Sequence, residues 1–149
     1  MNDPIIRKME VADVEEVIEV EKASFTTSWT ADIFYQEITE NKYAHYYVLE
    51  LDGKIVGYAG AWIVYEDAQI TNIAIRPEYR GKKLGEKLFQ FMMQLAMNEG
   101  AVRLSLEVRI SNIVAQRMYR KFGLVPAGIR KSYYTDNNED AIVMWVSFQ

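Results

Sequence analysis

The 149-residue sequence contains no cysteine. This absence excludes disulfide bonds, metal sites built on thiolates and catalysis by a cysteine nucleophile. Histidine is almost as scarce, and the single one, His45, is expected to be a packed or surface residue of a strand rather than a catalytic base. No grouping of His, Asp and Glu has the spacing of metal ligands, so the sequence predicts no metal site.

Long hydrophobic runs are missing as well. No apolar run is long enough to span a bilayer, and the first residues, MNDPIIRKME, lack the apolar core of a signal peptide. A cytoplasmic protein without membrane contact is therefore expected. Positive charge is also in deficit, since the formal net charge is −4. This balance argues against a surface that binds the phosphate backbone of nucleic acid.

What the sequence does contain is enough apolar material for one folded domain. Hydrophobic residues make up 50% of the chain, and neither a linker nor an internal repeat divides it. Alternating and helically spaced apolar residues predict the element order β-α-α-β-β-β-α-β-α-β-β. We therefore expect a single domain over residues 1–149, with an α/β fold in which helices cover a mixed sheet.

Local signals mark several boundaries within that order. Thr30 is a candidate N-cap of the second helix, and Asp52-Gly53 predicts a tight hairpin turn. Gly100 and Gly123 are predicted to end the two later helices. The acidic helical segment EVIEVEK, residues 16–22, is expected to be a solvated face.

The fourth predicted strand carries a phase shift. Its apolar residues alternate at Ala68 and Ile70. They resume at Ile73 and Ile75, one position out of phase. A slip of one residue within a strand is what a β-bulge produces. Because bulges bend a strand and free backbone groups, often beside active sites, we expect a bulge near Thr71.

The stretch RPEYRGKKLG, residues 76–85, is strongly basic in an acidic chain. It follows a predicted strand, contains two glycines and opens a helix whose apolar stripe begins at Leu84. Free N–H groups of the first helical turn, the helix dipole and the basic side chains would together form an anion site. A plain solvated turn is the alternative. The spacing of Gly and Lys matches neither the P-loop nor the dinucleotide fingerprint.

A second stretch, LEVRISNIVAQRMYRKFG, predicts the end of a strand followed by a helix. Glu107 lies among apolar strand residues, where a raised pKa would suit a general base. The alternative is an outward-facing carboxylate paired with Arg103 or Arg109. Tyr119 lies two helical turns after Asn112 and shares its helix face. It is either a core residue or an acid.

Together these motifs resemble the GNAT superfamily of acetyl-CoA-dependent N-acetyltransferases over nearly the whole chain. NIAIRPEYRGKKLG is similar to the acetyl-CoA segment of that superfamily, with its Arg/Gln-x-x-Gly-x-Gly/Ala loop. More narrowly, LEVRISNIVAQRMYRKFG and IRKSYYTDNNEDAIVMW resemble the RimI-type ribosomal-protein-alanine N-acetyltransferases. The resemblance implies a GNAT-like, mostly antiparallel mixed sheet with helices on both faces and a bulged fourth strand.

The resemblance also implies roles for the matching residues. Backbone groups of the fourth strand would hold the acetyl-pantetheine arm, and a backbone N–H there would polarise the thioester carbonyl. The basic loop would cradle the pyrophosphate. Glu107 would take a proton from the acceptor ammonium, and Tyr119 would protonate the departing thiolate. The residues implied in binding acetyl-CoA are Ile73, Ala74, Ile75, Arg80, Gly81, Lys82, Lys83, Leu84, Gly85, Asn112 and Tyr119.

The acceptor that the resemblance implies is a protein N-terminus, most narrowly the N-terminal Ala of a small-subunit ribosomal protein. Its groove would be lined by the loop FTTSWT, especially Trp29, and by Tyr133 and Tyr134. An α-amine has a pKa of about 8 against about 10.4 for Lys, so a neutral Lys costs about 3 kcal/mol more at pH 7. A small amine or Lys acceptor, and an acetyl-CoA-binding module without turnover, are the alternatives. The sequence leaves the oligomeric state open.

Two positions depart from the family pattern. Lys83 stands where the family has the first Gly of its loop, and a side chain there is strained if φ is positive. We expect Lys83 to keep an ordinary right-handed helical φ and to offer its amide to a phosphate. Ser28 stands where the RimI-type pattern has Pro, which leaves the rigidity of the acceptor loop open.

Overall fold

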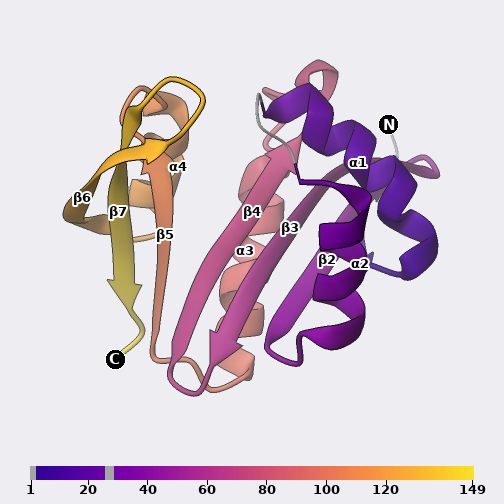
Figure 1. The fold of residues 1–149 in the computed structure, drawn as a ribbon. Helices are drawn as coiled ribbons and strands as arrows, with labels where there is room; N and C mark the ends of the chain where they lie inside the picture. Colours follow the sequence, from indigo (N-terminus) through magenta and orange to yellow (C-terminus); the bar gives the residue numbers. More distant parts are fainter. Residues whose placement is uncertain (1–2, 26–28) are drawn as a thin grey trace. The chain divides into compact units, whose positions relative to one another are not determined.

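The computed structural model describes residues 3–25 and 29–149. The helices are α1 (Val14–Ser24), α2 (Ala31–Glu40), α3 (Leu84–Asn98) and α4 (Ile113–Lys121). The strands are β1 (Ile5–Lys8), β2 (Ala44–Leu51), β3 (Lys54–Val64), β4 (Asp67–Ile75), β5 (Arg103–Arg109), β6 (Val125–Tyr134) and β7 (Glu139–Ser147). The predicted order of helices and strands is confirmed (Figure 1).

The strands form one sheet in the order β1-β2-β3-β4-β5-β7-β6. β4 and β5 pair in parallel, whereas β1–β2, β2–β3, β5–β7 and β6–β7 are antiparallel pairs. The expected mixed, mostly antiparallel sheet is confirmed. The chain forms two compact units, Met1–Trp62 with Thr71–Met92, and Ile63–Ile70 with Met93–Gln149. The single domain stays a prediction.

The first unit has helices on both faces of its strands. Figure 1 shows α1 and α2 on one face and α3 on the other. Val14, Val17 and Val20 follow the helical period along α1 and are fully buried. They belong to one apolar cluster with Phe34 of α2 and Tyr58 of β3. This core holds the helices against the sheet and so positions the loops at their ends.

The local boundary signals act as predicted. Thr30 caps α2, because its Oγ1 accepts a hydrogen bond from the backbone N of Ile33 at 3.4 Å. Asp52 and Gly53, with φ of +52° and +81°, make the turn between β2 and β3. Gly100 and Gly123 follow α3 and α4 with φ of +93° and +92°, the left-handed geometry that ends helices.

In the second unit, β5 alternates between buried and half-buried residues. Leu104, Leu106 and Val108 are buried, and Glu107 lies on the opposite face, as the period of a strand requires. α4 follows at once, with Asn112 as N-cap. β6 is exposed along most of its length.

The burial pattern of β4 neither confirms nor contradicts the predicted bulge. Ala68 and Ile70 are buried, as the alternation requires. Further along, Ala74 and Ile75 are both buried, so consecutive residues on opposite faces are covered. Burial on both faces removes the contrast that would reveal a change of phase, and the bulge stays a prediction.

Candidate active site

The basic loop between β4 and α3 contains two residues with left-handed backbone. Gly81 has a φ of +80° and Lys83 a φ of +62°. The prediction of a right-handed helical φ for Lys83 is therefore wrong. Lys83 directly precedes α3, and its carbonyl accepts a hydrogen bond from the backbone N of Lys87 at 3.2 Å, so the chain must turn at this residue to enter the helix. Turns of this kind direct backbone N–H groups into one concavity that suits an anion.

The basic side chains of this loop differ in the contacts that they make within the protein. Arg80 Nε donates to the carbonyl of Ile75 at 3.1 Å. Lys82 Nζ lies 5.3 Å from the ring centroid of Tyr79. Lys82 and Lys83 are both exposed. The loop therefore presents two exposed ammonium groups beside the start of a helix, and these residues fit the pyrophosphate that the family resemblance implies.

The end of β4, Ile73–Ile75, packs closely against β3. A Cβ atom on Gly57 would lie 2.5 Å from Ile75 Cδ1 and 2.8 Å from the carbonyl oxygen of Ala74. Glycine is required at this position because any side chain would push β4 away. Sequence reasoning did not single out Gly57, since no local pattern marks the close approach of two strands.

Trp29, expected to line the acceptor groove, is held in the first unit by a backbone hydrogen bond and by contacts with aromatic rings. Its backbone N donates to Glu21 Oε2 at 2.8 Å. Its ring centroid lies 5.2 Å from that of Phe34. The neighbouring position Ser28 lies outside the described residues, and the expectation about it stays a prediction.

Glu21 corrects the expectation that EVIEVEK is only a solvated face. The residue is 2% exposed, and its Oε1 accepts a hydrogen bond from the hydroxyl of Tyr58. Burial raises the pKa of both groups. The spacing contained the signal, because Glu21 comes seven residues after Val14 and shares its buried helix face.

The hydroxyl of Tyr58 also orients Asn72. Because its proton is donated to Glu21, the Tyr58 oxygen accepts a hydrogen bond from Asn72 Nδ2, at 3.3 Å. The Oδ1 atom of Asn72 is then buried without a hydrogen-bond partner among the described residues. A polar chain thus runs from α1 through β3 to the part of β4 just before Ile73.

Glu107, the candidate base, has a side chain that is 10% exposed. Its Oε1 lies 3.1 Å from Gln69 Nε2, 3.4 Å from the Tyr133 hydroxyl and 3.7 Å from Arg130 Nη1. The predicted base, Glu107, therefore contacts Tyr133, which was predicted to line the groove for the acceptor substrate. Gln69 and Arg130 were missed, because their sequence distance from Glu107 leaves no local signal.

The alternative in which Glu107 pairs with Arg103 or Arg109 is wrong. Arg103 pairs with Asp67 instead. Arg109 pairs with Asp136 Oδ2 at 2.8 Å and with Glu139 Oε1 at 3.1 Å. Hydrogen bonds from Ser111, and then from the Arg109 guanidinium, lower the pKa of Glu139 to about 2.

In the second unit, Tyr119 is buried and Tyr134 is partly buried. Tyr119 is 5% exposed, and burial raises its pKa, so its hydroxyl keeps its proton at neutral pH. Burial likewise raises the pKa of Tyr134 to about 12. The Arg109 guanidinium lies 4.0 Å from the ring centroid of Tyr134, and the rings of Tyr133 and Tyr134 meet edge to face at 5.1 Å. A protonated, buried hydroxyl such as that of Tyr119 can serve as a general acid.

Asn112 has a structural task in α4. Its Oδ1 accepts a hydrogen bond from the backbone N of Ala115 at 3.1 Å, which satisfies a free donor of the first helical turn. Its cofactor role stays a prediction. The residues predicted to bind acetyl-CoA belong to both compact units, with Ile73–Gly85 in the first and Asn112 and Tyr119 in the second.

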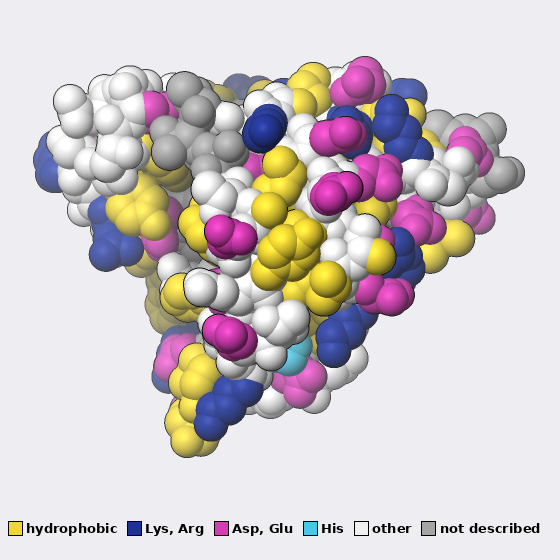
Figure 2. All heavy atoms as spheres, turned by 45° about the vertical axis from the view of Figure 1, so that its right-hand side comes forward, with side chains coloured by type: hydrophobic (Ala, Val, Ile, Leu, Met, Phe, Trp, Pro, Cys, Tyr) yellow, Lys and Arg dark blue, Asp and Glu magenta, His cyan; other side chains and the backbone are white. Residues whose placement is uncertain are grey.

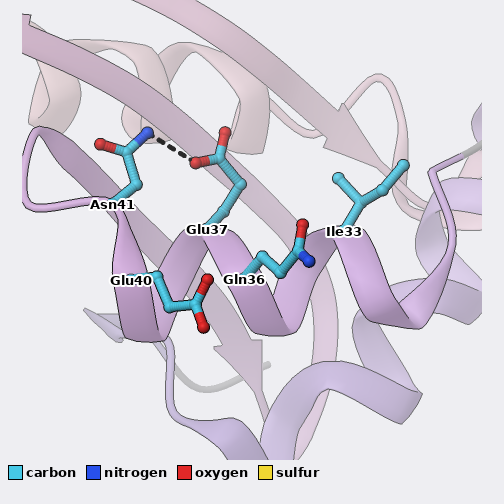
Figure 3. A pocket seen from close by; sticks show the side chains of 5 residues that line it. All are labelled: Ile33, Gln36, Glu37, Glu40 and Asn41. Carbon is cyan, nitrogen blue, oxygen red and sulfur yellow. Dashed lines mark hydrogen bonds between the residues drawn. The ribbon is translucent and has the colours of Figure 1, made fainter.

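A pocket of about 330 Å³ lies elsewhere, on α2. Its lining residues are Ile33, Gln36, Glu37, Glu40 and Asn41 (Figure 3). Glu37 Oε2 accepts from Asn41 Nδ2 at 2.7 Å, and Oε1 accepts from Trp62 Nε1 at 3.0 Å. On the face of the molecule drawn in Figure 2, acidic, basic and hydrophobic side chains are mixed. The pocket contains none of the predicted site residues.

Comparison with known proteins decides the family. Residues 14–124 match the model of the Acetyltransferase (GNAT) family. The chain belongs to the GNAT family. This GNAT chain is 58% identical, over 142 residues, to a Bacillus subtilis (strain 168) protein provisionally named ribosomal protein bS18-alanine N-acetyltransferase, covering 95% of this chain and 94% of the relative.

Two further matches extend the likeness. The Escherichia coli (strain K12) ribosomal protein bS18-alanine N-acetyltransferase is 31% identical over 141 residues, covering 93% of this chain and 94% of the relative. The crystal structure of the E. coli ribosomal-protein-S18-alanine N-acetyltransferase superposes with a TM-score of 0.90 at 29% identity, covering 99% of this chain and 95% of that one. The resemblance drawn from the motifs and the acyltransferase class are confirmed.

The described ranges, 3–25 and 29–149, contain no helix with the length and apolarity to cross a membrane. They also contain no group of three or more His, Asp or Glu residues placed to hold a metal ion.

Proposed function

We propose that this GNAT enzyme transfers the acetyl group of acetyl-CoA to the N-terminal α-amine of a protein, most narrowly the N-terminal Ala of a small-subunit ribosomal protein. The observation that carries the proposal is the Glu107 carboxylate, which is nearly buried and contacts Tyr133. The bS18-alanine N-acetyltransferases to which the chain is similar support the choice of acceptor.

Acetyl-CoA supplies the acetyl thioester as a co-substrate. Glu107 takes a proton from the acceptor ammonium, and the neutral amine attacks the carbonyl carbon, so that a C–N bond forms and the C–S bond breaks. Backbone N–H groups at Ile73–Ile75 polarise the carbonyl. Tyr119, whose raised pKa keeps its proton in place, protonates the leaving thiolate, and the second proton that the nitrogen loses as the amide forms restores the Tyr119 hydroxyl. Transfer is direct within a ternary complex, which fits the absence of cysteine from the chain.

The α-amine is favoured over a Lys side chain by the cost of the neutral form. At pH 7 the deprotonated Lys costs about 3 kcal/mol more than the deprotonated α-amine. A single carboxylate base such as Glu107 therefore suits the α-amine, which is the easier of the two groups to deprotonate. Trp29, Tyr133 and Tyr134 line the acceptor groove in this proposal, and the enzyme works in the cytoplasm without nucleic-acid or membrane partners.

The proposal is tested by an acceptor panel. Peptides that begin with Ala, acetyl-capped versions with an internal Lys, and polyamines are each mixed with acetyl-CoA, and the release of free CoA is measured. Turnover only with the free Ala terminus is expected; turnover confined to Lys peptides or polyamines contradicts the assignment. Tight calorimetric binding of CoA without turnover on any amine would indicate a binding module instead.

Two variants test the roles of the side chains. Glu107→Gln keeps the shape of the residue but removes the base, and Tyr119→Phe removes only the hydroxyl. Each is expected to lower kcat by about 10²-fold or more while leaving acetyl-CoA binding within a few-fold of the parent. Unchanged turnover in either variant removes that residue from the mechanism.

A further inference from the structure

The hydrogen-bond donors around Glu107 are distributed unequally between its two carboxylate oxygens. Oε1 accepts hydrogen bonds from Gln69 Nε2 at 3.1 Å and from the Tyr133 hydroxyl at 3.4 Å, and it forms an ion pair with Arg130 Nη1 at 3.7 Å. Among the described residues, the donor recorded near Oε2 is Gln69 Nε2, at 3.5 Å. A carboxylate oxygen offers about two lone pairs. Oε1 is therefore saturated, and Oε2 is the oxygen with capacity for a proton.

Gln69 is the donor that touches both oxygens. Its place follows from the parallel register of β4 and β5, in which Gln69 pairs with Ser105. Glu107 is two residues further along β5 and so points to the same face as Ser105. A donor that contacts both oxygens resists rotation of the carboxylate plane, because any rotation lengthens one of the two contacts.

We propose that Gln69 is a positioning residue for catalysis, an inference that rests on the proposed function of Glu107 as the base. It holds the Glu107 carboxylate with Oε1 covered and leaves Oε2 to take the proton from the acceptor ammonium. The amide does this without bringing a charge of its own to the carboxylate.

Several charged or titratable groups lie near Glu107. Arg130 of β6 makes the ion pair described above, and Tyr133 and Tyr134 of the same strand lie nearby. Arg109 lies two residues along β5 on the same face as Glu107 and pairs with Asp136 and Glu139 instead. The Arg130 side chain is 55% exposed, so solvent screens its charge. Loss of the Gln69 donor should leave the carboxylate plane free to rotate, which lowers kcat without changing the binding of acetyl-CoA.

Two substitutions at Gln69 test this with an Ala-starting peptide as the acceptor. Gln69→Leu removes the donor at nearly constant size, and Gln69→Glu replaces it with a second carboxylate of the same shape. For Gln69→Leu we expect kcat to fall about tenfold, because a carboxylate that is no longer held is misaligned for proton transfer. Gln69→Glu should lower kcat at least as much, because an ionised carboxylate has no hydrogen to donate to Glu107. The KM values for the peptide and for acetyl-CoA should not change.

A matched control is available on α3. Gln94 is exposed and donates to Asn98 Oδ1 at 3.0 Å, so Gln94→Leu removes an amide hydrogen bond away from Glu107 and should leave kcat and the KM values of the parent. Thermal melting of each variant confirms folding, and Gln69→Glu keeps the test valid if Gln69→Leu does not fold.

The outcomes separate the inference from the proposed function. A fall in kcat with a comparable rise in the KM values in both Gln69 variants would show a merely structural role, and a parental kcat would show no role; either result overturns the inference alone. Full turnover in Glu107→Gln would overturn the choice of base and the inference together.

Discussion

The left-handed backbone of Lys83 leads to a prediction about stability. A residue with a side chain in this conformation costs about 1–2 kcal/mol, which glycine does not incur. Replacement by glycine removes this cost but also destabilises the fold by about 0.5–1 kcal/mol, because glycine gives the unfolded chain more conformational entropy. Lys83→Gly should therefore stabilise the fold by about 0.5–1 kcal/mol, or about 1–4 °C in Tm for a chain of this size.

Two control variants isolate the backbone effect. Lys83→Ala removes the same ammonium group but keeps the unfavourable φ, so it should not gain stability. Lys82→Gly makes the same exchange at the preceding exposed residue, whose φ is not positive, and should destabilise by about 0.5–1 kcal/mol. Urea unfolding of the variants gives the free energies. Equal destabilisation by Lys82→Gly and Lys83→Gly would refute the left-handed geometry.

The same series separates backbone from charge in binding. Strain at Lys83 is present with and without ligand, so relieving it should not itself tighten acetyl-CoA binding. Loss of one exposed ammonium should weaken binding a few-fold, equally in Lys83→Gly and Lys83→Ala. Titration calorimetry with acetyl-CoA measures both variants. Binding at least tenfold tighter in Lys83→Gly than in the parent would show that the loop must rearrange to hold its ligand.

The remaining predictions concern buried and paired carboxylates. Glu21→Leu leaves the Trp29 N–H and the Tyr58 hydroxyl without their acceptor and should destabilise the fold by about 2–4 kcal/mol in urea unfolding. Glu15→Leu, at an exposed position of the same helix, is the control and should have little effect. Similar losses of stability in the two variants would contradict the buried network. The pKa of Glu139 is lowered from 4.5 to about 2, so its contribution to stability is present above about pH 4.5 and is lost as the pH falls toward 2. Glu139→Gln should therefore flatten the dependence of Tm on pH in that range, and an unchanged slope would argue against the pairing.

Much of the fold could be read from local patterns. The element order, the turn at Asp52-Gly53 and the helix ends at Gly100 and Gly123 match the structure. Each depends on a few neighbouring residues, whose spacing or permitted φ limits the backbone whatever packs against it. The family also followed from the chain, because its motifs are contiguous stretches.

The candidate site was only partly accessible in this way. Glu107 and Tyr133 were both predicted from motifs, but their contact depends on β6 and β5 lying in one sheet. Gln69 comes from a third strand, 38 residues from Glu107, and nothing in its own neighbourhood sets it apart from a surface glutamine. Glu21 was assigned to a solvated face because acidic composition outweighed its helical spacing.

The sequence by itself determined which elements form, where they end and which family the chain belongs to, because these depend on short-range periodicity and on contiguous motifs. Tertiary structure decided the φ of Lys83, the burial of Glu21 and the oxygen of Glu107 that stays open. These properties arise where segments distant in the chain meet and exclude water. Only there do burial and hydrogen-bond geometry acquire values that no local pattern encodes.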